Sequence, residues 1–441
     1  MIDMDNLNKG KQIYKIAEEI FPIYRCLTGN GVRATLNILS KKIKEIDGNG
    51  INVYEIPSGE KAFDWTIPKE WEIKDAYIEN EKKERIVDIK QNNLCVVGYS
   101  DKVDRWVNRD ELIKYIYVQE NQPDVIPYVT SYYERRYGFC MSKKKRDALG
   151  NGKYHMYIDS NLFDGSMTYG ELIIPGETKK ELFFSTYICH PSMANNECSG
   201  PALLTEIIRY VKLMNNRRYT YRFIFIPETI GAIAYLSRND NLKIMKENMI
   251  AGFNLTCVGD NRDFSIVHSR YGNTMADKAL SSVLKCMPQH SEYSFLKRGS
   301  DERQYNAPGI DLPVVTFCRS KFHEYKEYHT SADNMSVISA EGFQGSYYVI
   351  KNVIDILECN TKYKVTVLGE PQLGKRGLYP TVSKMGSTNS VRDMMNVLAY
   401  SDGYNDLFDI CRITDIPIVE VMNISNVLVK QKLLEDCKLN I

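Results

Sequence analysis

The sequence predicts an α/β protein whose core is a mixed, largely parallel sheet with helices on both faces. The main observation is a set of continuous apolar segments, ELFFSTYICH, YRFIFIP, MIAGFNLTCV and DLPVVTFCR, in the middle of the chain. Strands that are buried on both faces have this uniformly apolar character, unlike the alternating strands of a half-exposed sheet. The segments alternate with helical patterns, as they do in folds that cover a parallel sheet with crossover helices.

The remaining elements are assigned in chain order. Apolar residues spaced three and four apart predict two amphipathic helices between residues 10 and 46. Short extended runs separated by charged turns then predict a small β-rich insertion at 51–125. The core resumes afterwards, with helices expected near residues 200–214, 230–238, 273–287 and 339–358.

After residue 364 the pattern changes to a short helix, a second helix, a turn and a third helix, which is typical of a winged-helix module. We therefore predict three parts. Residues 1–50 and 126–362 form the α/β core, 51–125 an inserted domain and 363–441 a winged-helix domain.

Composition limits the classes of partner. The 441 residues include 57 Lys and Arg against 56 Asp and Glu, so no net field favours nucleic acid or an anionic membrane. The eleven cysteines include no C-x-x-C pair, which indicates reduced thiols. We see neither a signal segment nor an apolar run of membrane-spanning length, and expect a cytoplasmic protein.

Three titratable residues follow predicted strands. His190 follows the first apolar strand, Glu228 ends the next one in FIPETIGA, and His329 lies in EYHTSADN after the last. Sites in open α/β sheets lie beyond the carboxyl ends of the strands, so these side chains are expected to converge. Neutral imidazoles bind zinc and a nearby carboxylate accepts protons from water, so the set predicts a metal-dependent hydrolytic site.

At these residues the sequence resembles the two-zinc exopeptidases of aminopeptidase and glutamate-carboxypeptidase type. The matching segments are His190, the turn NECSG at 196–200, ETIG at 228–231, NLTCVG at 254–259 and HTSADN at 329–334. Over nearly the whole chain it resembles a bacterial family of aminopeptidase-like proteins associated with polysaccharide biosynthesis. The strings RCLTGNGVRATL, VVGYSDKVDRW, CHPSMANNECSGP and GSDERQYNAPGIDLP carry this second resemblance.

The resemblance implies metal ligands, but three acidic ligands of the superfamily are replaced by neutral residues, Asn196, Thr229 and Thr256. Neutral side chains cannot offset the roughly four positive charges of two zinc ions. We therefore predict one zinc ion, held by His190 and His329. The third ligand is Asn196, or one of the nearby carboxylates Glu197 and Asp260, and the resemblance assigns Glu228 as the general base.

Four further residues are predicted around this centre. The segment GSDERQY lies where aminopeptidases contact substrate, so Asp301 and Arg303 are candidates for substrate binding; a solvated turn is the alternative for Arg303. Glu324 and Tyr328 are candidates to orient His329, or else residues of a surface loop.

Two functional hypotheses remain open. The first is a zinc-dependent exopeptidase or amidase acting on a peptide-like or amino-sugar substrate. The second is a catalytically inactive relative that binds a peptide or glycan as a scaffold protein. Residues 365–441 contain eight basic and nine acidic side chains, so the winged helix is expected to contact protein or form a homo-oligomer rather than bind DNA.

Overall fold

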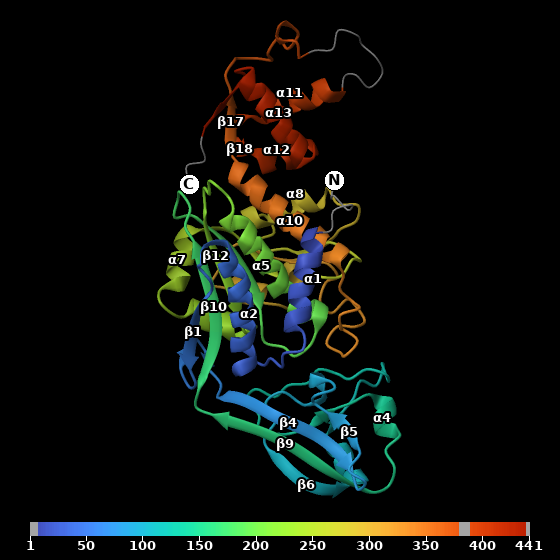
Figure 1. Ribbon diagram of the computed structural model, residues 1–441. Coiled ribbons are helices and arrows are strands. Elements are labelled where there is room, and N and C mark those ends of the chain that lie inside the picture. The colour runs from blue at the N-terminus through green and yellow to red at the C-terminus, as the bar shows by residue number, and fades with distance from the viewer. Residues whose placement is uncertain (1–7, 379–388, 438–441) are drawn as a thin grey trace. The chain divides into compact units, whose positions relative to one another are not determined.

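The computed structural model describes residues 8–378 and 389–437. Residues 1–7 of the predicted core and residues 379–388 and 438–441 of the predicted winged-helix domain lie outside the described residues. The structure contains two compact units (Figure 1). The first comprises residues 1–272 and 291–348, and the second residues 273–290 and 349–441.

An eight-stranded sheet forms the centre of the first unit. Its strand order is β1-β10-β12-β11-β13-β16-β14-β15, and the four central strands β12, β11, β13 and β16 are parallel to their neighbours in this group. The prediction of a mixed, largely parallel sheet is confirmed. The bounds are β1 Asn52–Pro57, β10 Ser166–Ile174, β11 Glu181–Tyr187, β12 Thr220–Ile226, β13 Met249–Leu255, β14 Ser265–Val267, β15 Ser291–Tyr293 and β16 Val314–Cys318.

Helices cover both faces of this sheet, as predicted. On one face α5 (Ser199–Lys212) packs against β11 and is itself covered by α1 (Asn8–Ile20) and α2 (Asn30–Asp47). On the other face α6 (Ile230–Leu236) shares an apolar cluster with Phe183 and Tyr187 of β11, and α7 (Asn241–Asn248) contacts β13. Successive residues of β11 point to opposite faces, which explains why every residue of this strand is buried.

A four-stranded antiparallel sheet, β5-β4-β9-β6, forms the inserted part (Figure 1). Its strands are β4 Glu70–Asn80, β5 Arg85–Asp88, β6 Val103–Asn108 and β9 Lys153–Phe163. This sheet therefore uses residues 70–163, whereas the predicted insertion spans 51–125. The difference arises because β1 joins the main sheet through β10, while the long strand β9 pairs with β4 over ten residue pairs.

Short elements complete the first unit. They are β2 Lys61–Ala62, β3 Trp65–Thr66, α3 Arg109–Leu112, β7 Ile116–Tyr117, β8 Phe139–Cys140, α4 Lys143–Asp147 and α9 Glu302–Tyr305. The last long helix, α10 (Ala340–Cys359), begins in the first unit and ends in the second.

The second unit has the winged-helix arrangement that the sequence predicts. A three-stranded sheet of β18, β17 and β19 accompanies helices α11, α12 and α13. Helix α8 (Met275–Leu284) also belongs to this unit. The bounds are β17 Lys362–Val365, α11 Asn389–Tyr400, β18 Asp402–Asp406, α12 Leu407–Thr414, α13 Ile418–Lys430 and β19 Leu434–Asp436.

Across residues 8–378 and 389–437, no helix combines the length and apolar character that crossing a bilayer requires. The carboxyl ends of β11, β12 and β13 lie on one edge of the main sheet because these strands are parallel. The loops that follow them carry the residues singled out in the sequence.

Candidate metal and catalytic site

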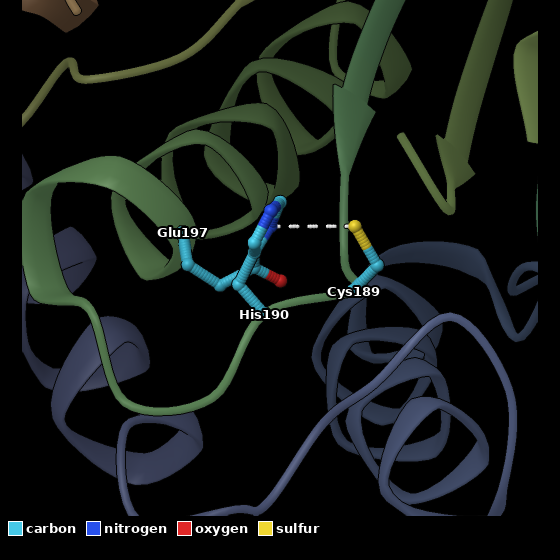
Figure 2. A group of neighbouring side chains, drawn as sticks. All are labelled: Cys189, His190 and Glu197. Carbon is cyan, nitrogen blue, oxygen red and sulfur yellow. Dashed lines mark hydrogen bonds and ion pairs between the residues drawn. The ribbon is translucent and has the colours of Figure 1, made fainter. Parts of the chain in front are cut away.

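His190 is held by a buried carboxylate. It lies three residues beyond the end of β11, and its Nδ1 is 2.8 Å from Oε2 of Glu197 (Figure 2). Glu197 comes from a π-helical turn, Ala194–Cys198, that leads directly into α5. A carboxylate on one ring nitrogen fixes the imidazole tautomer and leaves the other nitrogen available to a metal or a proton donor. In this structure the available atom is Nε2.

Arg25 pairs with the other oxygen of the Glu197 carboxylate. Its Nε lies 3.4 Å from Glu197 Oε1 and also donates to the backbone oxygen of His190 at 3.2 Å. The Arg25 and Glu197 side chains are both 1% exposed or less. A buried carboxylate needs such compensation because its desolvation is costly. Arg25, Glu197 and His190 therefore form one connected polar group.

Glu228 faces the other side of His190. Its Oε2 lies 3.6 Å from His190 Nε2, and its side chain remains one-fifth exposed. The next residue, Thr229, has a left-handed φ of 65°, and its N–H donates to Asp301 Oδ1 at 2.7 Å. Asp301 is completely buried, and this hydrogen bond supports the left-handed turn next to Glu228.

The two histidines have opposite proton affinities. Burial lowers the pKa of His329 to about 2, helped by the charge of His190. Burial also acts to lower the pKa of His190, but the Glu197 hydrogen bond and the charges of Glu197 and Glu228 outweigh it, and the net pKa is raised. Burial raises the pKa of Glu228, although His190 and Arg303 oppose this. The His329 imidazole is therefore neutral, with a lone pair on one ring nitrogen. Glu228 has the raised pKa that is typical of a general acid–base group.

The two histidine rings lie near each other. The ring centroids of His190 and His329 are 5.7 Å apart. Two imidazoles on one tetrahedral zinc, each with a Zn–N bond of about 2 Å, place their centroids roughly 5 Å apart. Tyr128 contacts both rings edge-on, at 5.1 and 5.2 Å, and its N–H donates to the His329 backbone oxygen. The two rings are therefore neighbours, but among the described residues no group of three His, Cys, Asp or Glu ligand atoms within 4.8 Å of one another includes His329.

Asn196 belongs to a neutral hydrogen-bond network. Its Nδ2 donates to the Tyr187 hydroxyl at 2.7 Å, and this hydroxyl also bonds Thr256 Oγ1. Asn196 Oδ1 is buried and has no hydrogen-bond partner among the described residues, so it remains available as an oxygen ligand. These groups occupy positions where the resemblance expects two aspartates. The hydrogen-bonded side chains of Asn196, Tyr187 and Thr256 therefore carry no formal charge.

The structure also brings together Cys189, His190 and Glu197, whose possible ligand atoms lie within 4.8 Å of one another (Figure 2). Two observations argue against a cation on this side of the imidazole. Burial strongly raises the pKa of the Cys189 thiol, whose sulfur accepts the Glu228 N–H. The Arg25 guanidinium already provides the positive charge beside Glu197. The thiol and Glu197 lie on the Nδ1 side of the imidazole, whereas Glu228 lies on the Nε2 side.

The other predicted site residues lie around this centre. Arg303 is exposed and donates to Thr229 Oγ1 at 2.5 Å, beside the Glu228 turn. Tyr328 stacks on His329 with ring centroids 3.9 Å apart. Glu324 is half-exposed and lies 3.9 Å from Lys321 Nζ. The substrate-binding and orienting roles of these residues remain predictions.

Sequence reasoning missed three residues that complete the site. Arg25 and Tyr128 come from segments more than 60 residues before His190, so only the fold brings them close. Asp333 accepts the backbone N–H groups of Asn195 and Asn196, at 2.7 and 2.9 Å. The one sequence signal for Asp333 is its place in the HTSADN segment, four residues after His329.

Comparison with known families assigns most of the chain. Residues 14–360 match a family described as a domain of unknown function, DUF4910, and residues 361–436 match a winged helix-turn-helix family. The chain belongs to the DUF4910 family. Its DUF4910 region contains all the site residues described above, and its second match coincides with the winged-helix elements.

Related proteins agree with this assignment. A Clostridium acetobutylicum protein, named for polysaccharide biosynthesis and an aminopeptidase-like domain, is 43% identical over 421 residues, covering 92% of this chain and 94% of the relative. A crystal structure of a C. acetobutylicum protein described as a peptidase has a TM-score of 0.89 and 40% identity, covering 98% of this chain and 97% of that one.

More distant structures share the fold. A zinc aminopeptidase from Bacillus subtilis has a TM-score of 0.56 at 12% identity, covering 79% of this chain and 95% of its own. A peptidase M28 precursor from Shewanella amazonensis has a TM-score of 0.56 at 11% identity, covering 83% and 96%. The first unit thus has an aminopeptidase-like fold, as predicted.

Proposed function

We propose that this protein is a metal-dependent hydrolase of aminopeptidase type, an exopeptidase or amidase, that uses a single zinc ion. The observation that carries the proposal is the arrangement around His190, with Glu197 on Nδ1 and Glu228 3.6 Å from Nε2. His329 and Asn196 would complete the ligand set. A zinc ion bound there would supply Lewis acidity toward a substrate carbonyl.

The protein's own residues account for the proton transfers. Glu228, with its raised pKa, would accept a proton from the attacking water and return it to the leaving amine. Asp301 would keep Glu228 in place through the Thr229 N–H. Arg303, exposed next to the same turn, would bind a substrate carboxylate through its planar guanidinium.

The substrate class follows from this chemistry and from the relatives. An aminopeptidase-like fold with a proton-transferring glutamate suits hydrolysis of an amide bond. The name of the C. acetobutylicum relative refers to polysaccharide biosynthesis. We therefore consider two substrate classes, aminoacyl amides and N-acylated amino sugars. We therefore expect a small peptide-like or amino-sugar amide.

The test is a hydrolysis assay on the zinc-supplemented full chain with aminoacyl p-nitroanilides and N-acetyl amino sugars. Glu228→Gln should lower kcat/KM by at least about 100-fold, since a positioned acid–base group contributes roughly 10²–10⁴-fold. Glu134→Gln, at a side chain that is 80% exposed, is the matched control. Absence of turnover on every substrate, or full activity of Glu228→Gln, would reject this function.

A second function, that of a catalytically inactive peptide- or glycan-binding scaffold, is favoured by the neutral Asn196–Tyr187–Thr256 network. It predicts ligand binding that is insensitive to chelators and no hydrolysis. The expected cytoplasmic location and homo-oligomer remain proposals, to be tested by cell fractionation and light scattering.

A further inference from the structure

A separate cavity of about 560 Å³ lies at the junction of the core and the inserted sheet, both within the first unit. The core contributes Phe21 and Tyr24, just after α1, together with Ser192 and Ser331. The inserted part contributes β4 and residues 89–93. His190, His329 and Glu228 are not among the residues that line this cavity. Its volume is within the usual range for small-molecule sites.

The cavity combines apolar walls with amide and hydroxyl groups. Phe21, Tyr24, Ile73 and Ile89 provide the apolar part. The polar part includes Asn93, which is 7% exposed and whose Oδ1 has no hydrogen-bond partner among the described residues. A buried acceptor without a donor is costly, so a ligand hydroxyl or amine would be stabilised there.

The charges of the lining point to an anionic ligand. Lys74 and Lys90 line the cavity, and no Asp or Glu is found among its described lining residues. Lys74 makes no ion pair with any described residue, and Lys90 has only a long contact of 3.9 Å with Asp75. The lining therefore carries the positive charges of two lysines, of which Lys74 has no counter-ion among the described residues, and a ligand carboxylate or phosphate would pair with them through charge-assisted hydrogen bonds.

We propose that this cavity binds a sugar carrying a carboxylate or phosphate group. The ring's C–H face lies on the apolar wall, its hydroxyls bond the amides and serines, and its anionic group pairs with Lys74 and Lys90. This binding is independent of the proposed hydrolase function, because it requires neither the metal nor Glu228.

The test is calorimetric titration of the full chain with D-glucuronate, D-glucose 6-phosphate and neutral methyl glucoside. We expect saturable binding of an acidic sugar and much weaker binding of the neutral one. The Lys74→Ala/Lys90→Ala double variant should weaken binding at least about tenfold, because each lost contact involves a charged group. The Lys82→Ala/Lys102→Ala double variant removes two exposed lysines of the inserted part and should bind normally.

Two further measurements locate the ligand. Asn93→Asp keeps the side-chain shape but adds a negative charge, so it should also weaken binding of the acidic sugars. Hydrogen exchange should slow in residues 89–93 and at Ser192 and Ser331 when ligand is bound. The proposal would be overturned if neither acidic sugar binds, or if the neutral sugar binds equally well. It would also be overturned if the Lys74→Ala/Lys90→Ala variant or Asn93→Asp binds the acidic sugars as the natural chain does, or if protection is confined to residues 300–305.

Discussion

Glu197→Gln is the substitution that most directly probes how the site is organised. The Glu197 side chain is fully buried, 2.8 Å from His190 Nδ1 and 3.4 Å from Arg25 Nε. Glutamine keeps the size and an acceptor oxygen but removes the negative charge. His190 then loses the carboxylate that fixes its orientation and raises the basicity of Nε2.

The expected loss of zinc affinity is about 10–100-fold, the usual effect of removing such a supporting group. This range corresponds to roughly 1.4–2.7 kcal/mol, in line with the ~1.5–3 kcal/mol of a hydrogen bond to a charged group. Arg25 keeps its bonds to Ile20 and His190 but loses its counter-charge, so the free energy of unfolding should fall by up to about 3 kcal/mol.

The assay is competition for zinc with a chromophoric chelator, combined with urea unfolding of the same samples. Glu171→Gln is the control, since Glu171 is a buried partner of Arg222 at 2.8 Å and neither contacts His190. It should lower stability but leave zinc affinity unchanged. Unaltered zinc affinity in folded Glu197→Gln would refute the orienting role of Glu197.

Three further predictions concern pH, the arginine and the winged helix. Zinc affinity should fall about tenfold per pH unit below the raised pKa of His190, because Nε2 of His190 must lose its proton before it binds the ion, whereas His329 stays neutral in this range. Chelator titrations from pH 5.5 to 7.5 measure this, and an affinity that does not change with pH would contradict it. Arg25→Met should lower the free energy of unfolding by about 3 kcal/mol or more, because it leaves the Glu197 carboxylate buried without its cation. A free energy of unfolding in urea equal to that of the natural chain would contradict this. The full chain should not retard random duplex DNA at low salt, since residues 365–441 have no excess of basic side chains; tight binding in a gel-shift assay would overturn that view.

The central sheet was predictable because β11, β12, β13 and β16 are mostly apolar and do not alternate between apolar and polar residues. The limits of the insertion were harder to predict. β9 alternates like any exposed hairpin strand, and its pairing with β4, more than 70 residues earlier, depends on long-range contacts.

The site shows the same contrast. His190 and Glu228 could be placed together because parallel strands end at one edge of a sheet, and the structure brings them within 3.6 Å. The role of Glu197 was open, because a turn sequence does not reveal which of two adjacent polar side chains points at the histidine. Arg25 and Tyr128 could not be found from local spacing, since their contacts with His190 exist only in the folded chain.

The most direct test of the account is the zinc content of the full chain after incubation with zinc and desalting. We predict about one zinc per chain, and none in the His190→Ala/His329→Ala double variant provided that it remains folded by circular dichroism. A natural chain that retains no zinc, or a folded double variant that retains it, would contradict a single metal centre at these two histidines.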